Sequence, residues 1–163
     1  MAATYTPIAS ITLGATASSV TFSSIPSTYT DLVLVASTTN TSAAGNNLMR
    51  LNSDTGSNYS RTRLTGNGTS ATTGRGTSET TLYFGDTGNP SNFSTTIYHL
   101  MNYANTTTNK TILARSGAGD VQVHLVTGLW RNTAAINTIL LYPESNNYSS
   151  GSTFNLYGIL AGS

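Results

Sequence analysis

The sequence predicts an all-β fold, and three observations support this prediction. Short apolar runs recur about every ten residues along the chain, and spacers rich in turn-forming residues separate them. Thr, Ser and Asn occur 30, 21 and 16 times, and these side chains suit turns and solvated sheet faces better than helix interiors. No segment shows a convincing helical period. Together these features favour a two-sheet antiparallel sandwich, jelly-roll-like, of about ten strands.

The apolar runs define the strands that we expect. Apolar and polar residues alternate in several of them, as Ala9, Ile11 and Leu13 do in the first. The expected strands cover residues 8–13, 20–25, 31–37, 47–51, 59–64, 79–84, 93–101, 110–115, 121–130, 136–142 and 152–160. Residues 65–78 contain no large apolar side chain, so we expect a mobile loop there.

The length of 163 residues suits a single domain, residues 1–163, with a short N-terminal arm of about residues 1–7. This arm has neither the basic nor the apolar region of a signal peptide, and no apolar stretch is long enough to span a membrane. We therefore expect no membrane partner. Tyr5 and Pro7 make the arm a candidate contact with a neighbouring chain.

The run Leu32-Val33-Leu34-Val35 is apolar on both faces of the expected strand. A strand of a two-layer sandwich normally has one solvated face. Either loops cover the second face, or another subunit does, because contiguous exposed apolar patches tend to be interfaces. The second interpretation makes Leu32 and Leu34 candidate partner contacts.

Residues for catalysis are few. The histidines are His99 and His124, and no Gly-x-Ser-x-Gly motif accompanies either. We expect His124 on a solvated strand face, opposite to Val123 and Leu125, and His99 as a packed or interface residue. Only six carboxylates are present, mostly at strand starts or in turns, and there is no cysteine. The sequence therefore indicates no enzyme, no cofactor, no metal and no small-molecule substrate.

For the turn around Asp54 and for the single tryptophan, the sequence favours structural roles over binding roles. The segment Asp54-Thr-Gly-Ser-Asn58 has oxygen ligands but lacks the bidentate Glu of a calcium loop, so a structural turn is favoured over a weak calcium site. Trp130 ends an expected strand, and we expect it to be a buried corner residue rather than an exposed anchor.

Positive charge concentrates between residues 50 and 75, where four Arg and one Asp give a net charge of +3. Arg61 and Arg63 share a strand face by the two-residue period. The patch is small and lacks the stacking aromatics of nucleic-acid modules, so no nucleic-acid partner is expected. Arg50, Arg61 and Arg63 form either a solvated sheet edge or a surface that docks onto an acidic protein.

Several segments resemble a family of small all-β virion structural proteins of tailed bacteriophages. The resemblance is carried by Ile8-Ala-Ser-Ile-Thr-Leu-Gly14, Tyr29-Thr-Asp-Leu-Val-Leu-Val-Ala-Ser37, Asn52-Ser-Asp-Thr-Gly-Ser-Asn-Tyr-Ser60 and Gly151-Ser-Thr-Phe-Asn-Leu-Tyr-Gly158. It covers nearly the whole chain and contains no catalytic signature. The segment before Asp54 is shorter than the family pattern, which leaves the register of the Arg50 strand open.

The resemblance implies a virion location, on the outer surface of the head or on the tail. The first expectation is a capsid decoration (cement) protein, a homotrimer that binds the major capsid protein and stabilises the head. The alternative is a tail-fibre or receptor-binding module that contacts host surface glycans through polar loops. The expected partner contacts are Tyr5, Pro7, Leu32, Leu34, Arg50, Arg61 and Arg63.

Overall fold

The computed structural model describes residues 4–42, 45–119 and 121–160, and every element in these ranges is a β-strand. The strands are β1 (Thr6–Thr12), β2 (Val20–Phe22), β3 (Asp31–Thr38), β4 (Asn46–Leu51), β5 (Tyr59–Gly66), β6 (Ala71–Glu79), β7 (Leu82–Asp86), β8 (Ser94–Met101), β9 (Lys110–Ala118), β10 (Gln122–Trp130), β11 (Ile139–Pro143) and β12 (Thr153–Ile159). The predicted all-β class is confirmed, with twelve strands in these ranges rather than about ten.

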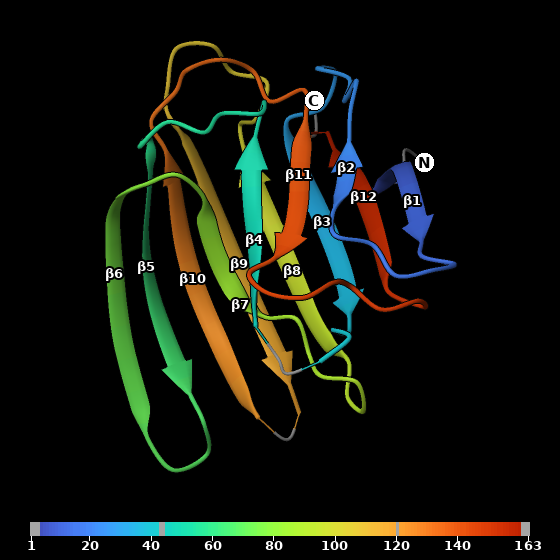
Figure 1. The fold of residues 1–163 in the computed structure, drawn as a ribbon. Coiled ribbons are helices and arrows are strands. Elements are labelled where there is room, and N and C mark those ends of the chain that lie inside the picture. The colour runs from blue at the N-terminus through green and yellow to red at the C-terminus, as the bar shows by residue number, and fades with distance from the viewer. Residues whose placement is uncertain (1–3, 43–44, 120, 161–163) are drawn as a thin grey trace.

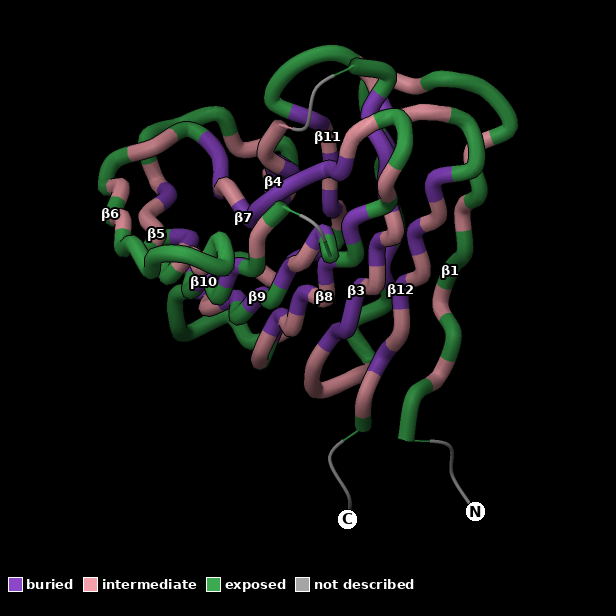
Figure 2. Tube along the Cα trace, turned by 90° about the horizontal axis from the view of Figure 1, so that it is seen from below, coloured by how far each residue is buried: buried purple, intermediate pink, exposed green. Residues whose placement is uncertain are grey.

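The strands form two antiparallel sheets that lie face to face (Figure 1). The large sheet has the strand order β1-β12-β3-β8-β9-β10-β5-β6, and the small sheet has the order β2-β11-β4-β7. Seen from below, the small sheet covers one face of the large sheet, and the buried residues gather between the two layers (Figure 2). The two-sheet architecture is therefore confirmed, whereas the jelly-roll detail is not.

The inward positions of both sheets, which alternate with outward ones along each strand, form the core between the sheets. Many of these positions carry aromatic side chains. Trp130 stacks on Tyr59 with ring centroids 6.4 Å apart, and Phe84 meets Tyr98 edge to face at 5.1 Å. All four rings are at most 1% exposed. The expectation that Trp130 is buried is confirmed.

One strand at the edge of the large sheet was not predicted from the sequence. Residues 65–78 were expected to form a mobile loop, but β6 occupies Ala71–Glu79 and pairs with β5 over its length. The turn between them is short: the side chain of Asn67 accepts hydrogen bonds from the backbone of Thr69 and Ser70. Because β6 is an edge strand with little buried surface, its Thr and Gly residues suffice, and no large apolar side chain is needed.

Candidate interaction surface

The large sheet has one face turned away from the small sheet, which we call the outer face. Apolar side chains run across it in register: Leu64 lies opposite Leu125 on the next strand, and Leu113 lies opposite His99, which lies opposite Val33. Val123 is 60% exposed, Leu125 49% and Leu113 41%. We call this group the apolar stripe. Its exposed members are Leu64, Leu113, Val123 and Leu125; Val35, Ile97 and Tyr157 are partly exposed, and Val33 is buried at 7% exposure.

The apolar stripe contains few polar groups. The Nε2 atom of His99 lies 3.0 Å from Oδ2 of Asp31, and the other carboxylate oxygen of Asp31 accepts the backbone N–H of Asn102. Arg115 lies between Ile97 and Leu125 in the strand register and pairs with no acid among the described residues. Four exposed apolar side chains on three neighbouring strands, with partly exposed apolar side chains beside them, are typical of an interaction surface.

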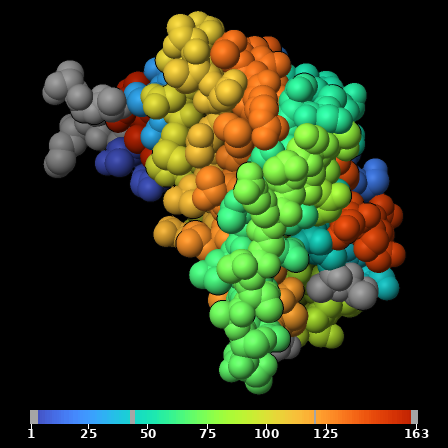
Figure 3. All heavy atoms as spheres, turned by 90° about the vertical axis from the view of Figure 1, so that its left-hand side faces the viewer, coloured from blue at the N-terminus to red at the C-terminus, as the bar shows by residue number. Residues whose placement is uncertain are grey.

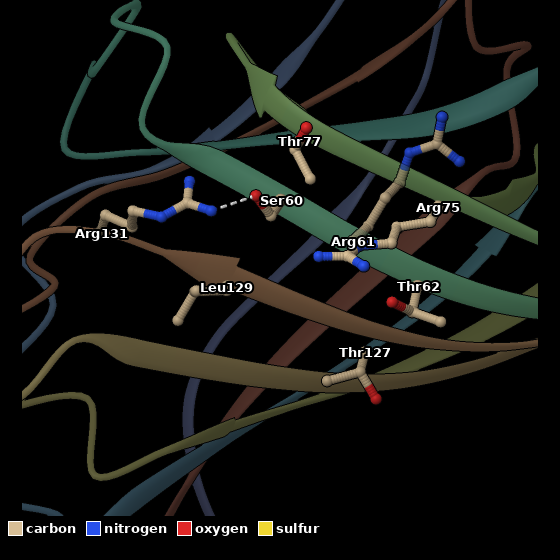
Figure 4. Close-up of a pocket in the computed structure, with 8 residues that line it drawn as sticks. All are labelled: Ser60, Arg61, Thr62, Arg75, Thr77, Thr127, Leu129 and Arg131. Atoms are coloured by element: carbon tan, nitrogen blue, oxygen red, sulfur yellow. Dashed lines mark hydrogen bonds between the residues drawn. The ribbon is translucent and has the colours of Figure 1, made fainter.

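A shallow hollow at the β6 side of the outer face collects hydroxyl groups and arginines (Figure 4). Its volume is about 230 Å³, and we call it the arginine hollow. Ser60, Thr62, Thr77 and Thr127 supply hydroxyls, Leu129 supplies an apolar side chain, and Arg61, Arg75 and Arg131 complete the lining.

The three arginines of the hollow differ in their contacts. Arg131 donates to the Oγ atom of Ser60 at 2.5 Å, and Arg75 has no hydrogen bond or ion pair with a described residue. Arg61 extends to the inner side of the sheet, where its Nε lies 3.1 Å from Glu79 and its guanidinium covers the ring of Tyr83 at 4.5 Å. Glu79 thus neutralises Arg61, whereas Arg75 and Arg131 keep their charge facing the hollow.

The predicted basic surface of Arg50, Arg61 and Arg63 is not one face. Arg50 lies on β4 of the small sheet, where it donates to the carbonyl of Thr80 and covers the ring of Tyr142. Arg63 lies on the inner side of the β5–β6 hairpin against Gly74. The linear count of charge between residues 50 and 75 therefore grouped side chains that belong to different sheets.

Leu32 and Leu34 are fully buried between the sheets, so the expectation that they touch a partner is wrong for this fold. Val33 and Val35 alternate with them on the outer face, where Val33 is only 7% exposed and Val35 is partly exposed, so other parts of the chain already cover Val33. The run Leu32–Val35 indicated a strand that is apolar on both faces, but it did not reveal which of the two faces lies in the core.

The N-terminal contacts are partly placed. Residues 1–3 of the expected arm lie outside the described residues, and Pro7 already belongs to β1, an edge strand. Tyr5 is 53% exposed, and its ring packs edge to face against Tyr157 at 6.1 Å. Tyr5 therefore borders the apolar stripe, where its free side remains open to a partner.

A buried polar group resembles a catalytic arrangement. The Oγ1 atom of Thr65 lies 2.9 Å from Nδ1 of His124, and Nε2 of His124 lies 3.5 Å from Oδ2 of Asp86, which also accepts from Gln122 at 2.7 Å. Burial alone would raise the pKa of Asp86, but the contacts with His124 and Gln122 outweigh it and hold this pKa below its usual value.

The His124 side chain is 2% exposed, so a substrate could not reach its ring unless the sheets separated. The group therefore links β10 of the large sheet to β7 of the small sheet. The expectation that His124 faces solvent was wrong, because Val126 and Trp130 on the same strand face fix that face inward. Among the described residues, no three acidic or histidine side chains gather as metal ligands would.

Asp54 is a structural turn residue. Its carboxylate accepts hydrogen bonds from the indole N–H of Trp130 at 2.7 Å, from the side chain of Asn58 at 2.9 Å and from the backbone of Gly56 at 2.8 Å. This use of both oxygens supports the structural interpretation of the turn. It also provides a hydrogen-bond acceptor for the indole N–H, the only polar group in the buried side chain of Trp130.

Reasoning from the sequence missed the two surfaces that the fold assembles. The alternation of Val123 and Leu125 was visible, but the opposite face, which carries His124, was expected to be the solvated one. The arginine hollow had no sequence signal, because its residues come from three strands and the segment after β10.

No protein-family model matches the chain, and a search of curated proteins also finds no match. In the part of the chain that the structure describes, no helix is long and apolar enough to cross a lipid bilayer.

Proposed function

We propose that the chain is a virion structural protein of a tailed bacteriophage, a capsid decoration (cement) protein. In this proposal it assembles as a homotrimer and binds the outer surface of the major capsid protein without catalysing a reaction. The resemblance of the sequence to small all-β virion proteins suggests the setting. The observation that carries the proposal is the apolar stripe on the uncovered outer face.

The size of the outer face fits a protein interface. The stripe runs across the six strands from β12 to β5, which lie about 4.8 Å apart and make a face roughly 24 Å wide; strands of seven to nine residues are roughly 24–30 Å long. The product is roughly 600–700 Å², close to the surface of about 800 Å² that one partner contributes to a standard interface. Exposed Leu and Val side chains would gain roughly 25 cal/mol for each Å² that the partner covers.

Other copies of the chain are the proposed cover for the part of this face that carries the apolar stripe. An apolar stripe with Arg115, which pairs with no described acid, and one paired carboxylate, Asp31, offers little charge that a foreign acidic or basic surface could recognise. The small sheet and the loops then remain free to contact the shell. Binding only to an assembled shell stabilises that shell by mass action.

The composition of the chain agrees with this role. Charged residues make up 8% of the chain, against roughly 25% in average globular proteins. Hydroxyl and amide groups form hydrogen bonds whose strength depends little on salt, in contrast to exposed ion pairs. Contacts built from such groups would persist when a particle passes between solutions of different ionic strength.

The test removes the apolar stripe without touching the core. The double variant Leu113→Ser, Leu125→Ser changes two exposed side chains, and the control Phe93→Ser changes a side chain of similar exposure that lies before β8. We expect the purified wild type and the control to sediment as trimers of the 17.0 kDa chain, and the double variant to sediment as a monomer. A monomeric wild type at micromolar concentration, or a trimeric double variant, would contradict the proposed interface.

A second measurement concerns the shell itself. We expect wild type and control to saturate assembled shells that lack the protein, and the double variant to bind them at least tenfold more weakly, since it loses the avidity of three linked contacts. Equal occupancy by the double variant would show that trimer formation is not needed for binding.

The alternative is a tail-fibre or receptor-binding module. The arginine hollow favours it, because its open lining of hydroxyls and arginines is accessible to a ligand on another surface. Particle location discriminates the two functions: a decoration protein is labelled by antibody over the head, and a receptor-binding module only at the tail.

A further inference from the structure

We infer that the arginine hollow is a binding site for a carboxylate-bearing sugar, such as a uronic acid unit of a polysaccharide. This inference goes beyond the proposed function. The hollow lies over β5, β6 and the Trp130 end of β10, beside the apolar stripe, so it is open to a ligand in a trimer whose contacts are confined to the stripe. The inference rests on the charge, the hydroxyl lining and the position of the hollow on the sheet.

The charge of the hollow selects an anion. Arg75 and Arg131 direct their guanidinium groups toward it from opposite sides, whereas Arg61 extends away to Glu79 (Figure 4). None of the residues that line the hollow is acidic. A guanidinium group recognises a carboxylate through two parallel hydrogen bonds, and Arg75 has no partner among the described residues that would compete for them.

The rest of the lining suits a sugar ring. Ser60, Thr62, Thr77 and Thr127 carry hydroxyls that both donate and accept hydrogen bonds, as the hydroxyls of a saccharide require. The side chain of Leu129 offers an apolar surface to the C–H face of a ring. A hollow of about 230 Å³ is smaller than a typical drug-sized pocket, so it holds one ring of a chain rather than a long ligand.

The position of the hollow favours a saccharide over an acidic peptide. An extended peptide usually binds a sheet by adding a strand at its edge, where backbone groups are unpaired. The hollow instead lies over β10, β5 and β6, and the backbone of β5 is paired on both sides. The β5–β6 hairpin runs along one side of the molecule (Figure 3), and the hollow lies on its outer face beside β10.

The backbone under the hollow is held in place because it belongs to paired strands. Thr62 lies directly between Arg75 on β6 and Thr127 on β10 in the strand register. Arg131 is held by its hydrogen bond to Ser60 and by its backbone N–H, which donates to the carbonyl of Asn58. A preorganised site loses less conformational entropy when it binds a ligand.

Binding of the intact protein to oligogalacturonate, measured by isothermal calorimetry at low salt, tests this inference. The comparison ligands are a neutral galactose oligomer of the same length and a polyglutamate peptide. We expect binding to oligogalacturonate and at least tenfold weaker binding to both comparison ligands. We also expect Arg75→Gln to weaken binding by about tenfold to a hundredfold, the usual effect of losing a charged hydrogen bond.

The matched control is Arg50→Gln, which removes the same charge from the small sheet. It should leave the affinity for oligogalacturonate within twofold of the wild type. No binding at millimolar ligand, equal binding of the neutral oligomer or of polyglutamate, or an equal loss in Arg50→Gln would each overturn the inference. Because the sedimentation of the Leu113→Ser, Leu125→Ser variant does not depend on the hollow, failure here leaves the proposed oligomer unaffected, and the reverse also holds.

Discussion

At the scale of single residues, the most consequential polar contact is that between Asp54 and Trp130. Trp130 is 1% exposed, and its indole N–H donates a hydrogen bond to the carboxylate of Asp54 in the surface turn. Burial acts to raise the pKa of Asp54, but the hydrogen bonds from Trp130, Asn58 and Gly56 outweigh it and lower this pKa. The turn therefore depends on the ionised form of Asp54.

Replacement of this carboxylate gives a prediction with a defined pH dependence. We expect Asp54→Ala to lower the free energy of unfolding at pH 7 by about 1–3 kcal/mol, because the buried indole N–H loses its acceptor. Since the pKa of Asp54 is lowered on folding, its contribution is present above the unfolded pKa, near 4, and is lost as pH falls through the folded value.

Urea unfolding monitored by tryptophan fluorescence, at pH 7 and near pH 3, checks both parts of this prediction. The gap between the wild type and Asp54→Ala should narrow at the lower pH, while Ser57→Ala in the same turn should behave as the wild type at both. A gap that stays constant or widens at low pH would show that the carboxylate charge does not stabilise the turn.

At the scale of elements, strands were easier to predict than the faces they bury. The runs at 8–13, 93–101 and 152–160 became β1, β8 and β12 within a few residues, because alternation and turn residues are local properties. The buried face of β10, which carries His124, was predicted to be the solvated one, and β6 was predicted to be a loop. Burial depends on which strands cover which, and an edge strand of Thr and Gly carries no apolar signal.

The packing of β12 gives a prediction at this scale. Gly158 on β12 lies under the ring of Tyr29, and a Cβ atom at this position would overlap the ring atoms. We expect Gly158→Ala to lower the free energy of unfolding by about 1–3 kcal/mol, as overpacked core positions do. Gly14, after β1, has nothing within 4 Å of such an atom, so Gly14→Ala is the matched control.

Thermal or urea unfolding of the two glycine variants measures this difference. Gly14→Ala should match the wild type or exceed it slightly, since alanine restricts the unfolded chain. Equal stability of both variants would mean that Tyr29 moves aside without cost, and that β12 does not depend on this close contact.

At the scale of the whole molecule, the sequence predicted the class and the number of layers but not the uneven size of the sheets. An eight-stranded sheet under a four-stranded one leaves a wide face without cover, and this inequality comes from long-range pairing such as β1 with β12. Neither the apolar stripe nor the arginine hollow is contiguous in sequence. The prediction that Leu32 and Leu34 contact a partner was wrong for the same reason. The run is apolar on both faces, and only the pairing of β3 with its neighbours decides which side chains face the core.

The copy number of the protein in purified virus particles tests the central claim most directly, because quantitative mass spectrometry can report it relative to the major capsid protein. A decoration protein occupies a site that the symmetry of the shell repeats, so the account predicts on the order of hundreds of copies per particle. A handful of copies would contradict a place on the shell and favour a tail module, and complete absence from the particles would contradict a virion protein altogether.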